Sequence, residues 1–460
     1  MITGRRVFMS LLSIGMLFLA LPTTVGAAPG ATHYEGTLLN GSTWIADKPA
    51  NWNGTLLIYS HGYIPGPALP APQEAPNNTA DELLAQGYAL AGSSYSRPGW
   101  ALETAADDQL ATVSAVQALI GPTKHVIAVG NSMGGLITGQ LAERAGDRID
   151  GALASCGLMV GGIDLHNAQL DGLHTLAQLL LPGRNVKLVR FSSIGEAIAT
   201  VNTLKTAVDE AQTTQKGRAR IALAAAFFHL PTWYTGQPKP ANRDYAAQEV
   251  GQYLSLIGGA AISDTALFRY ETGRFDVEQS AGGNPSWNKG VNYRKLLSES
   301  VNETQVRNLY RHAGLDLRDD LDQLTRSAAI TADPGAVQWM QRTSTLSGKI
   351  TVPVLSMHTT DDQLAPVQFQ EEYAEDVQQN GRASLLRQVF VDHPGHCTYT
   401  TAELLAAITT ISNRVETGRW ENTSARAMQK LATSFNAGES AFIRFTPGEF
   451  LADRSIPCYR

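Results

Sequence analysis

The sequence predicts an α/β fold: a mostly parallel β-sheet with helices on both faces, interrupted by a mainly helical cap insertion. Helical patterns separate four short apolar runs that read as buried strands, at residues 55–60, 88–95, 125–130 and 150–155. Strands this apolar need both faces of their sheet covered, which favours a parallel arrangement. The alternation stops at about residue 158 and resumes at residue 352. This break predicts an insertion between two strands.

Turn and capping signals delimit the predicted helices of the first half. Thr79 and Glu82 are spaced as a capping box for a helix that ends at Gly87. Apolar residues at helical spacing continue up to Gly121, where a glycine-proline pair stops the helix. A third helix is expected over residues 132–145.

The second half repeats the pattern of strand and helix. Strands are expected at residues 352–358 and 385–391, and helices at residues 367–378 and 400–417, the last opened by a Thr400 to Glu403 capping box. The helix candidates of the insertion are residues 173–181, 194–208 and 221–229. The expected organisation is residues 28–157 as the first part of the core, 158–347 as a cap, and 348–460 as the second part with a C-terminal tail.

Residues 1–27 read as a signal peptide. Arg5 and Arg6 precede an apolar run at residues 7–21, and small residues end at Ala27. The double arginine also resembles a twin-arginine export signal. The run is shorter than the roughly 20 apolar residues of a membrane span. We therefore expect a secreted or periplasmic protein with no stable membrane insertion after cleavage.

Charge and cysteine content narrow the class of protein. The net charge is −6, and removal of residues 1–27 takes away two arginines and no acid, which gives −8. This balance argues against nucleic acid as a partner. Three cysteines, Cys156, Cys397 and Cys458, allow one disulfide bond and one free thiol in an exported protein. A Cys156 to Cys397 bond and a Cys397 to Cys458 bond are both compatible with the sequence.

One short motif indicates the chemistry of the site. Residues 130–134 read Gly-Asn-Ser-Met-Gly, between a predicted strand and a predicted helix. A sharp strand-to-helix turn of this kind lifts the serine hydroxyl clear of the sheet, and side chains in place of Gly130 and Gly134 would clash. Ser132 is therefore the candidate nucleophile.

With this motif in its context, the sequence resembles the α/β-hydrolase family over residues 35–158 and 348–417. The resemblance implies an acid and then a histidine after the serine. Residues 358–366 are similar to the family's strand-end motif, which assigns the acid to Asp362. Thr359 replaces the usual glycine of that motif, and the adjacent Asp361 is a competitor.

The same resemblance assigns the general base. The loop Asp-His-Pro-Gly-His at residues 392–396 precedes the final predicted helix, as in the family. His396 follows the glycine and fits the base, whereas His393 precedes it and is the alternative. The backbone N–H of Met133, directly after the nucleophile, is one expected oxyanion donor. The family's histidine-glycine-x motif, present at His61, assigns the second donor to the N–H of Tyr63.

Two stretches are candidates for substrate contact. Trp100 follows a strand at the sheet edge expected to carry Ser132, so it is either a wall of the substrate pocket or a residue packed under the cap. The glycine-rich aromatic loop at residues 282–288 could also frame a pocket.

The sequence predicts an esterase that cleaves carboxylic esters through an acyl-enzyme, with a small-molecule or ester substrate. A peptidase or amidase of the same fold is the alternative, and it would need an acid such as Glu103 or Glu210 to bind an amino group. A ligand-binding protein without catalysis is a third possibility, although all three triad residues are present in order. No metal-binding or phosphate-binding motif occurs, so no cofactor and no metal are expected.

Overall fold

The computed structural model describes residues 30–67, 70, 71, 73–452 and 454. Its centre is one nine-stranded sheet in the order β1-β2-β4-β3-β5-β6-β7-β8-β9. The strands are β1 (Ala31–Thr37), β2 (Thr43–Pro49), β3 (Thr55–Ser60), β4 (Ala89–Ser93), β5 (His125–Asn131), β6 (Gly151–Ser155), β7 (Val354–Asp361), β8 (Leu386–Pro394) and β9 (Phe442–Ile443). The expected signal peptide, residues 1–27, lies outside the described residues.

The six central strands, from β4 to β8 in the sheet order, are parallel, and the outer strands β1, β2 and β9 are antiparallel to their neighbours. In the register of the sheet Ser60 pairs with Gly130, and Asn131 pairs with Ser155. The carboxyl ends of β3, β5 and β6 therefore lie side by side. Loops that follow parallel strands at such an edge are where folds of this kind bind ligands.

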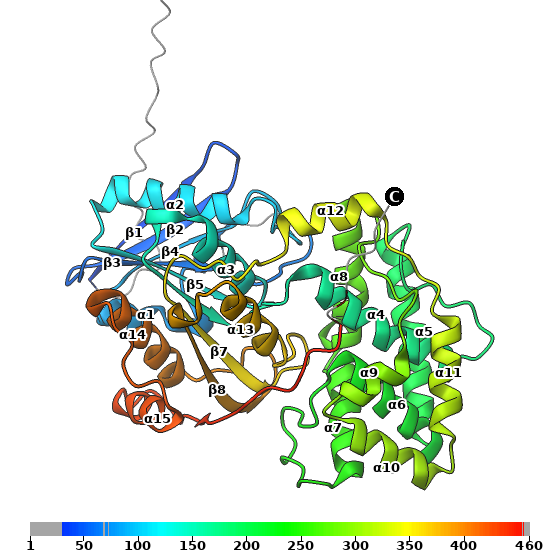
Figure 1. The fold of residues 1–460 in the computed structure, drawn as a ribbon. Helices are drawn as coiled ribbons and strands as arrows, with labels where there is room; N and C mark the ends of the chain where they lie inside the picture. Colours follow the sequence, from blue (N-terminus) through cyan, green and yellow to red (C-terminus); the bar gives the residue numbers. More distant parts are fainter. Residues whose placement is uncertain (1–29, 68–69, 72, 453, 455–460) are drawn as a thin grey trace, which may run out of the picture.

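Helices cover both faces of the sheet (Figure 1). Those packed against one apolar cluster are α2 (Ala105–Ile120), α3 (Met133–Arg144) and α13 (Phe369–Gln379). Those packed against the other are α1 (Ala80–Ala85), α14 (Thr401–Thr417) and α15 (Ala425–Ser434). Short 3-10 turns occur at Pro76–Asn78, Gly146–Arg148, Ile262–Asp264 and Ala383–Leu385. The predicted fold class is confirmed.

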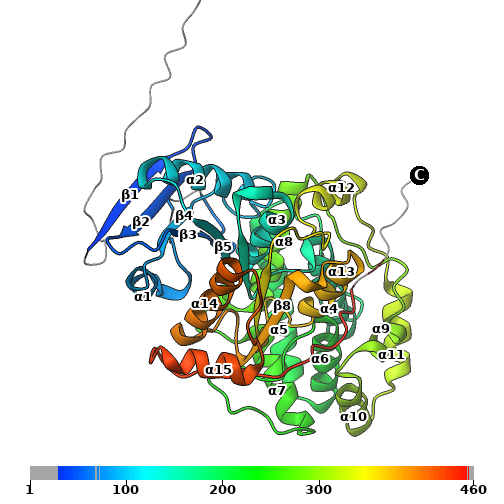
Figure 2. The same cartoon turned by 60° about the vertical axis from the view of Figure 1, so that its left-hand side comes forward.

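The chain between β6 and β7 forms a helical cap beside the sheet (Figures 1 and 2). Its helices are α4 (Gly161–Leu180), α5 (Ile194–Gln212), α6 (Gln215–Phe228), α7 (Tyr245–Ile257), α8 (Ala266–Ala281), α9 (Tyr293–Glu299), α10 (Glu303–Ala313), α11 (Leu317–Ser327) and α12 (Pro334–Thr343). Helix α4 joins two apolar clusters of the cap, because Leu173 belongs to one and Leu179 to the other. None of the helices in the described ranges has the length and apolarity needed to cross a membrane.

Two local expectations have different outcomes. The capping box at Thr400 is present, because its hydroxyl accepts the Glu403 N–H and the Glu403 carboxylate accepts the Thr400 N–H. The expected capping box at Thr79 is wrong. The Thr79 hydroxyl instead donates to the Pro76 carbonyl at 2.6 Å, which closes the preceding turn and leaves the helix without a side-chain cap.

Candidate active site

Ser132 lies in the sharp turn between β5 and α3, with φ 60° and ψ −124°. This region of backbone space is sparsely populated by residues other than glycine, so the turn is strained. A Cβ at Gly130 would lie 2.1 Å from the Gly134 carbonyl oxygen, and a Cβ at Gly134 would lie 1.9 Å from the Ser60 carbonyl oxygen. The two glycines are therefore required by contact with neighbouring backbone, as the sequence motif predicts.

The structure brings Asp362 and His396 together. Asp362 is 1% exposed, and its Oδ2 accepts a hydrogen bond from His396 Nδ1 at 2.7 Å. Its Oδ1 accepts the backbone N–H groups of Leu364 and Ala365 at 2.8 and 2.9 Å. Three donors thus hold the carboxylate, which fixes His396 in the tautomer with its proton on Nδ1 and leaves Nε2 free to accept a proton.

The two competing assignments lie elsewhere. Asp361, at the end of β7, accepts a hydrogen bond from the Thr360 hydroxyl, and within the described ranges no hydrogen bond or ion pair joins its carboxylate to His396. His393 is held by the buried carboxylate of Glu403 at 2.9 Å, and this hydrogen bond raises the pKa of His393. Both residues already have structural partners away from Ser132.

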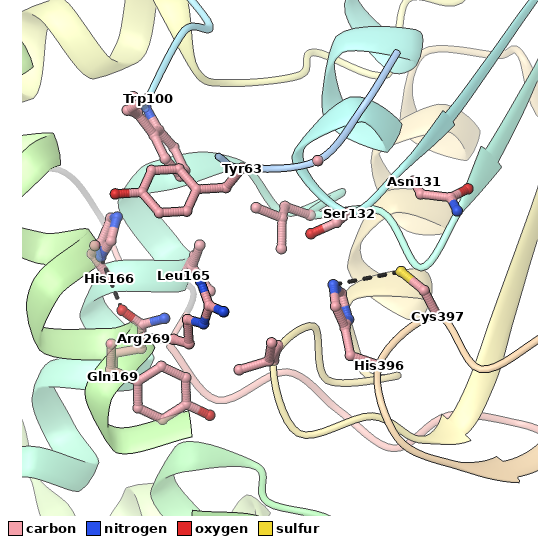
Figure 3. Close-up of a pocket in the computed structure, with 15 residues that line it drawn as sticks. Tyr63, Trp100, Asn131, Ser132, Leu165, His166, Gln169, Arg269, His396 and Cys397 are labelled. Atoms are coloured by element: carbon pink, nitrogen blue, oxygen red, sulfur yellow. Dashed lines mark hydrogen bonds between the residues drawn. The ribbon is translucent and has the colours of Figure 1, made fainter. Parts of the chain in front are cut away.

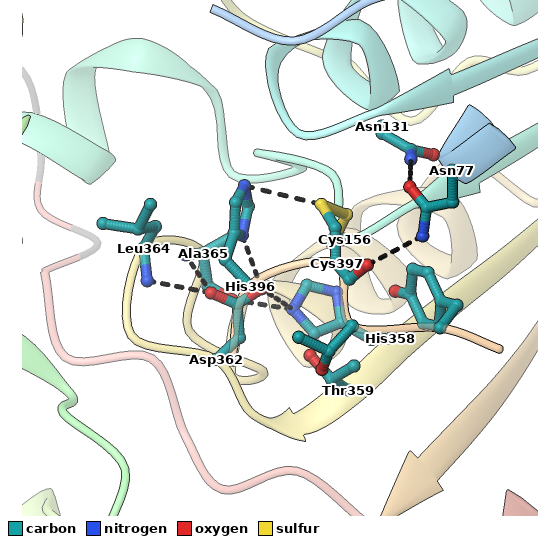
Figure 4. Close-up of a disulfide and its surroundings, with 12 residues drawn as sticks. Asn77, Asn131, Cys156, His358, Thr359, Asp362, Leu364, Ala365, His396 and Cys397 are labelled. Carbon is teal, nitrogen blue, oxygen red and sulfur yellow. Dashed lines mark hydrogen bonds and ion pairs between the residues drawn. A yellow bond between two sulfur atoms is a disulfide. The ribbon is translucent and has the colours of Figure 1, made fainter. Parts of the chain in front are cut away.

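A disulfide bond lies next to His396. It joins Cys156, directly after β6, to Cys397, and the two Cα atoms are 5.4 Å apart (Figure 4). His396 Nε2 lies 3.5 Å from the Cys397 Sγ, and within the described ranges no hydrogen bond joins it to the Ser132 hydroxyl. Such catalytic hydrogen bonds are often long in unliganded enzymes and tighten when substrate binds. Cys458, the third cysteine, lies outside the described residues.

The two backbone N–H groups expected to bind the oxyanion are those of Met133 and Tyr63. Met133 N is at the first position of α3, where a helix leaves its N–H groups unsatisfied. The loop after β3 passes close by, because a Cβ at Gly62 would lie 3.2 Å from the Ser132 Cβ and 3.7 Å from its Oγ. Neither Tyr63 N nor Met133 N donates to another group within the described ranges. Both expected oxyanion donors are therefore available to a ligand.

Ser132 and His396 line one pocket of about 470 Å³ between the sheet and the cap (Figure 3). The core contributes Gly62, Tyr63, Trp100, Asn131, Ser132, Leu364, His396 and Cys397. The chain between β6 and β7 contributes Leu158 and the helix residues Leu165, His166, Gln169, Arg269, Tyr270 and Gly273. Trp100 fulfils both readings of the sequence, because it lines the pocket and also donates its indole N–H to Ser344 of the cap at 3.0 Å.

Other sequence candidates lie away from this pocket. The loop at residues 282–288 is largely buried within the cap and does not line it. Glu103 is exposed and pairs with Arg97 at 3.5 Å, and Glu210 is exposed at the end of α5. No carboxylate lines the pocket within the part of the chain that the structure describes.

Sequence reasoning missed the polar residues that the cap adds, namely His166, Gln169 and Arg269. Their spacing offered one signal: residues 165, 166 and 169 lie one turn apart on α4, and residues 269 and 273 lie one turn apart on α8. That spacing places each set on one helix face but does not say which face meets the core.

Within the described ranges, one group of side chains is close enough to hold a metal ion: Cys156, His396 and Cys397. The two sulfur atoms are bonded to each other, so neither is a thiolate able to act as a metal ligand. These three side chains lie close together because Cys156 and Cys397 form the disulfide bond and His396 is next to Cys397 in the chain.

Comparison with known proteins agrees with this arrangement. A family model described as alpha/beta hydrolase fold matches residues 87–402. The chain is 26% identical over 439 residues to the o-phthalyl amidase of Xanthobacter agilis, an alignment that covers 89% of this chain and 93% of that protein.

Solved structures with low sequence identity are also similar. Feruloyl esterase B from Aspergillus oryzae aligns with a TM-score of 0.44 and 11% identity, over 87% of this chain and 86% of that chain. An acylaminoacyl peptidase from Pyrococcus horikoshii aligns with a TM-score of 0.32 and 9% identity, over 80% of this chain and 37% of that chain. The family match spans the strand that leads to Ser132 and the loops that carry Asp362 and His396, and the chain belongs to the α/β hydrolase fold family.

Proposed function

We propose that this protein is a serine hydrolase that transfers an acyl group from a carboxylic amide or ester to water through Ser132. The observation that carries the proposal is that Ser132 and His396 line the same pocket while Asp362 holds His396 from behind. A nucleophile, a base and an acid that orients the base make up a catalytic triad.

Each residue has a role in the proposed reaction. Ser132 Oγ attacks the substrate carbonyl carbon while His396 Nε2 takes the hydroxyl proton. The buried carboxylate of Asp362 stabilises the imidazolium that forms. The N–H groups of Tyr63 and Met133 donate to the oxyanion of the tetrahedral intermediate. His396 then gives its proton to the leaving amine or alcohol, and water releases the acid from the acyl-enzyme by the reverse sequence.

The proposal includes amides as well as the esters expected from the sequence. A relative that matches over nearly its whole length is named as an amidase. An aminopeptidase is less well supported, since the substrate's ammonium group would enter a pocket lined by Arg269 and by no described carboxylate.

We also propose that the protein acts outside the cytoplasm. The signal-like residues 1–27 support this, and so does the disulfide bond between Cys156 and Cys397, since such bonds persist mainly in oxidising compartments. N-terminal sequencing of the exported protein would test the proposed cleavage after residue 27.

The function is tested with matched substrates that share one acyl group, a benzoyl p-nitroanilide and a benzoyl p-nitrophenyl ester. The wild-type protein should hydrolyse both and should be labelled covalently by a fluorophosphonate. Ser132→Ala should abolish turnover and labelling with an unchanged circular dichroism spectrum, because alanine fits the turn and removes only the nucleophile. Labelling of Ser132→Ala at another serine would overturn the assignment.

A further inference from the structure

The cap side of the pocket is polar in a way that the proposed acyl transfer does not use. Figure 3 shows Ser132 and His396 on the core side of the cavity and His166, Gln169 and Arg269 on the cap side. None of these three cap residues contacts the triad through a hydrogen bond given by the structure. They are therefore available to contact the part of the substrate that does not react.

The amide of Gln169 is held in one orientation. Its Oε1 accepts a hydrogen bond from His166 Nδ1 at 3.0 Å. His166 is 3% exposed, and burial lowers its pKa to about 3, so the ring is neutral and its one proton serves this bond. The NH₂ group of Gln169 consequently points away from His166 into the cavity (Figure 3), where no described residue accepts its hydrogen bonds. The two N–H bonds of the Gln169 amide are therefore fixed donors in the cavity.

Arg269 adds a positive charge to the same side. Its side chain points into the cavity from α8, and within the described ranges it forms no salt bridge. Its charge is felt at Tyr63, whose pKa it lowers against the larger upward effect of burial. Asp276, on the same helix, is not among the pocket-lining residues, but it contacts two of them. It accepts the Trp100 backbone N–H at 2.7 Å and the Tyr63 hydroxyl, and it raises the pKa of Tyr63 more than Arg269 lowers it. A guanidinium and an amide NH₂ group are donors with no acceptor of their own, a combination suited to a carboxylate.

We propose that Arg269 and the Gln169 amide bind a carboxylate on the acyl group of the substrate, so that the enzyme cleaves monoamides and monoesters of dicarboxylic acids. The inference rests on the proposed function, because it names the substrate class of that same pocket. The acyl side is assigned because His396 must reach the leaving atom to protonate it. The leaving group therefore lies toward His396, and the remainder of the acyl group extends toward the cap.

Three apolar or aromatic side chains of the lining indicate the shape of the acyl group. Trp100, Leu165 and Tyr270 line the same cavity as Ser132 and the cap donors. These side chains suit a flat apolar spacer such as a benzene ring. Carboxybenzoyl amides, which carry the second carboxylate on the ring, combine both features.

The test compares 2-, 3- and 4-carboxybenzoyl p-nitroanilides with their methyl esters, which have the same shape and no charge. We expect kcat/KM of at least one isomer to exceed that of its methyl ester about tenfold or more, mainly through KM. Arg269→Gln should reduce this ratio to about threefold or less. Arg311→Gln, which makes the same charge change at an exposed position of α10, should keep the wild-type ratio.

A further compound tests whether the carboxylate site lies on the acyl side or on the leaving-group side. It is a benzoyl anilide that carries its carboxylate on the nitroaniline ring. Preference for this compound, lost in Arg269→Gln, would overturn the acyl placement. Ratios near one for all three carboxybenzoyl isomers, or ratios unchanged by Arg269→Gln, would overturn the proposal as a whole.

Binding measurements keep this inference separate from the proposed catalysis. Calorimetry of benzene dicarboxylates with Ser132→Ala protein should detect binding at low salt that weakens about tenfold in the Ser132→Ala, Arg269→Gln double variant. At high salt, where the Arg269 charge is screened, the weakening should be smaller. Hydrolysis without charge preference would refute the carboxylate site and leave the acyl transfer intact. Carboxylate binding by a protein that hydrolyses none of the amides or esters would refute the catalysis and leave the site.

Discussion

The tight turn at Ser132 combines a strained backbone with the N–H of Met133, and the other expected oxyanion donor, the N–H of Tyr63, comes from the loop after β3. Because Gly130 and Gly134 contact neighbouring backbone, the turn has no room to relax, and the hydroxyl stays at the edge of the pocket. Asp362 is similarly constrained by two backbone N–H groups of its own loop. The proposed chemistry thus depends on residues whose positions the local backbone determines.

The two neighbouring aspartates should respond differently to substitution. Asp362→Asn keeps the carbonyl oxygen that accepts the Leu364 and Ala365 N–H groups but presents an NH₂ group to His396 Nδ1, which forces the wrong tautomer. We expect kcat to fall by about 10⁴-fold, the loss seen when a triad acid becomes an amide. Asp361→Asn should cost little. Steady-state kinetics on one substrate checks both variants, and the opposite order would assign the acid to Asp361.

The disulfide beside His396 should stabilise both the fold and the base. It joins residues 241 positions apart, and closing so long a loop restricts the unfolded chain. The Cys156→Ser, Cys397→Ser double variant should lose about 2–5 kcal/mol of unfolding free energy. Its kcat should also fall, because Cys397 directly follows His396. Urea unfolding and kinetics measure the two effects, with Cys458→Ser as the control, and unchanged values in the double variant would contradict this role.

At the scale of elements, two cap helices decide the shape of the pocket. Helix α4 contributes Leu165, His166 and Gln169, and α8 contributes Arg269 and Gly273. The helices are linked behind the pocket by Arg274, which is fully buried and donates to the His166 carbonyl at 2.8 Å. The cap therefore presents its pocket residues from a packed surface.

Gly273 controls the room available to the acyl group. A Cβ at this helical position would meet nothing within 4 Å, so larger side chains enter the cavity without a clash. Gly273→Ala should raise stability by about 0.5–1 kcal/mol through helix propensity. Gly273→Leu should reduce kcat/KM for benzoyl substrates about tenfold more than for acetyl substrates, because it fills acyl space.

The control for this prediction is Gly335→Leu on α12, where a Cβ also meets nothing within 4 Å and which does not line the pocket. A similar shift in acyl preference in both variants would show that Gly273 has no special place in the pocket.

At the scale of the whole molecule, the chain after β9 joins the core to the cap (Figure 1). Phe450 packs against Phe369 of the core and against His229 at the end of α6. The Leu451 N–H donates to His229 Nε2 at 3.2 Å, and Arg454 pairs with Asp171 of α4. The cap is thus held by its two connections to the sheet and by the C-terminal segment.

The unfolding free energy should fall as pH decreases below about 6.5. Burial lowers the pKa of His229 to about 3, and protonation would break its acceptance of the Leu451 N–H. Between pH 6.5 and 3 the unfolded chain therefore binds more protons than the folded chain, and stability decreases with falling pH. His229→Asn, compatible with φ 59° at this position, should make this dependence shallower by about 1 kcal/mol per pH unit. Urea unfolding at pH 7.5, 6.5, 5.5 and 4.5 measures the slopes, and equal slopes would contradict the prediction.

The elements that could be predicted from the sequence are those whose cause is local. The strand β3 was predicted with the bounds it has, and β5, α3 and α14 were predicted to within a residue or two, because apolar runs, glycine stops and the Thr400 cap act over a few residues. The turn at Ser132 has the same origin, since the clashes that require Gly130 and Gly134 arise within one motif and its flanking strand.

Contacts between segments far apart in the chain could not be predicted in this way, because they arise from packing in the folded molecule. The sequence left open Asp361 or Asp362, and the partner of Cys397, because the direction of adjacent side chains and the proximity of distant cysteines depend on packing. Its helical spacing did not show which side chains of the cap line the pocket, where His166 and Gln169 share a cavity with Arg269 across about 100 residues of chain. A helix pattern records which side chains share a face, but the face that meets the core depends on how α4 and α8 pack, and that packing is a property of the folded molecule.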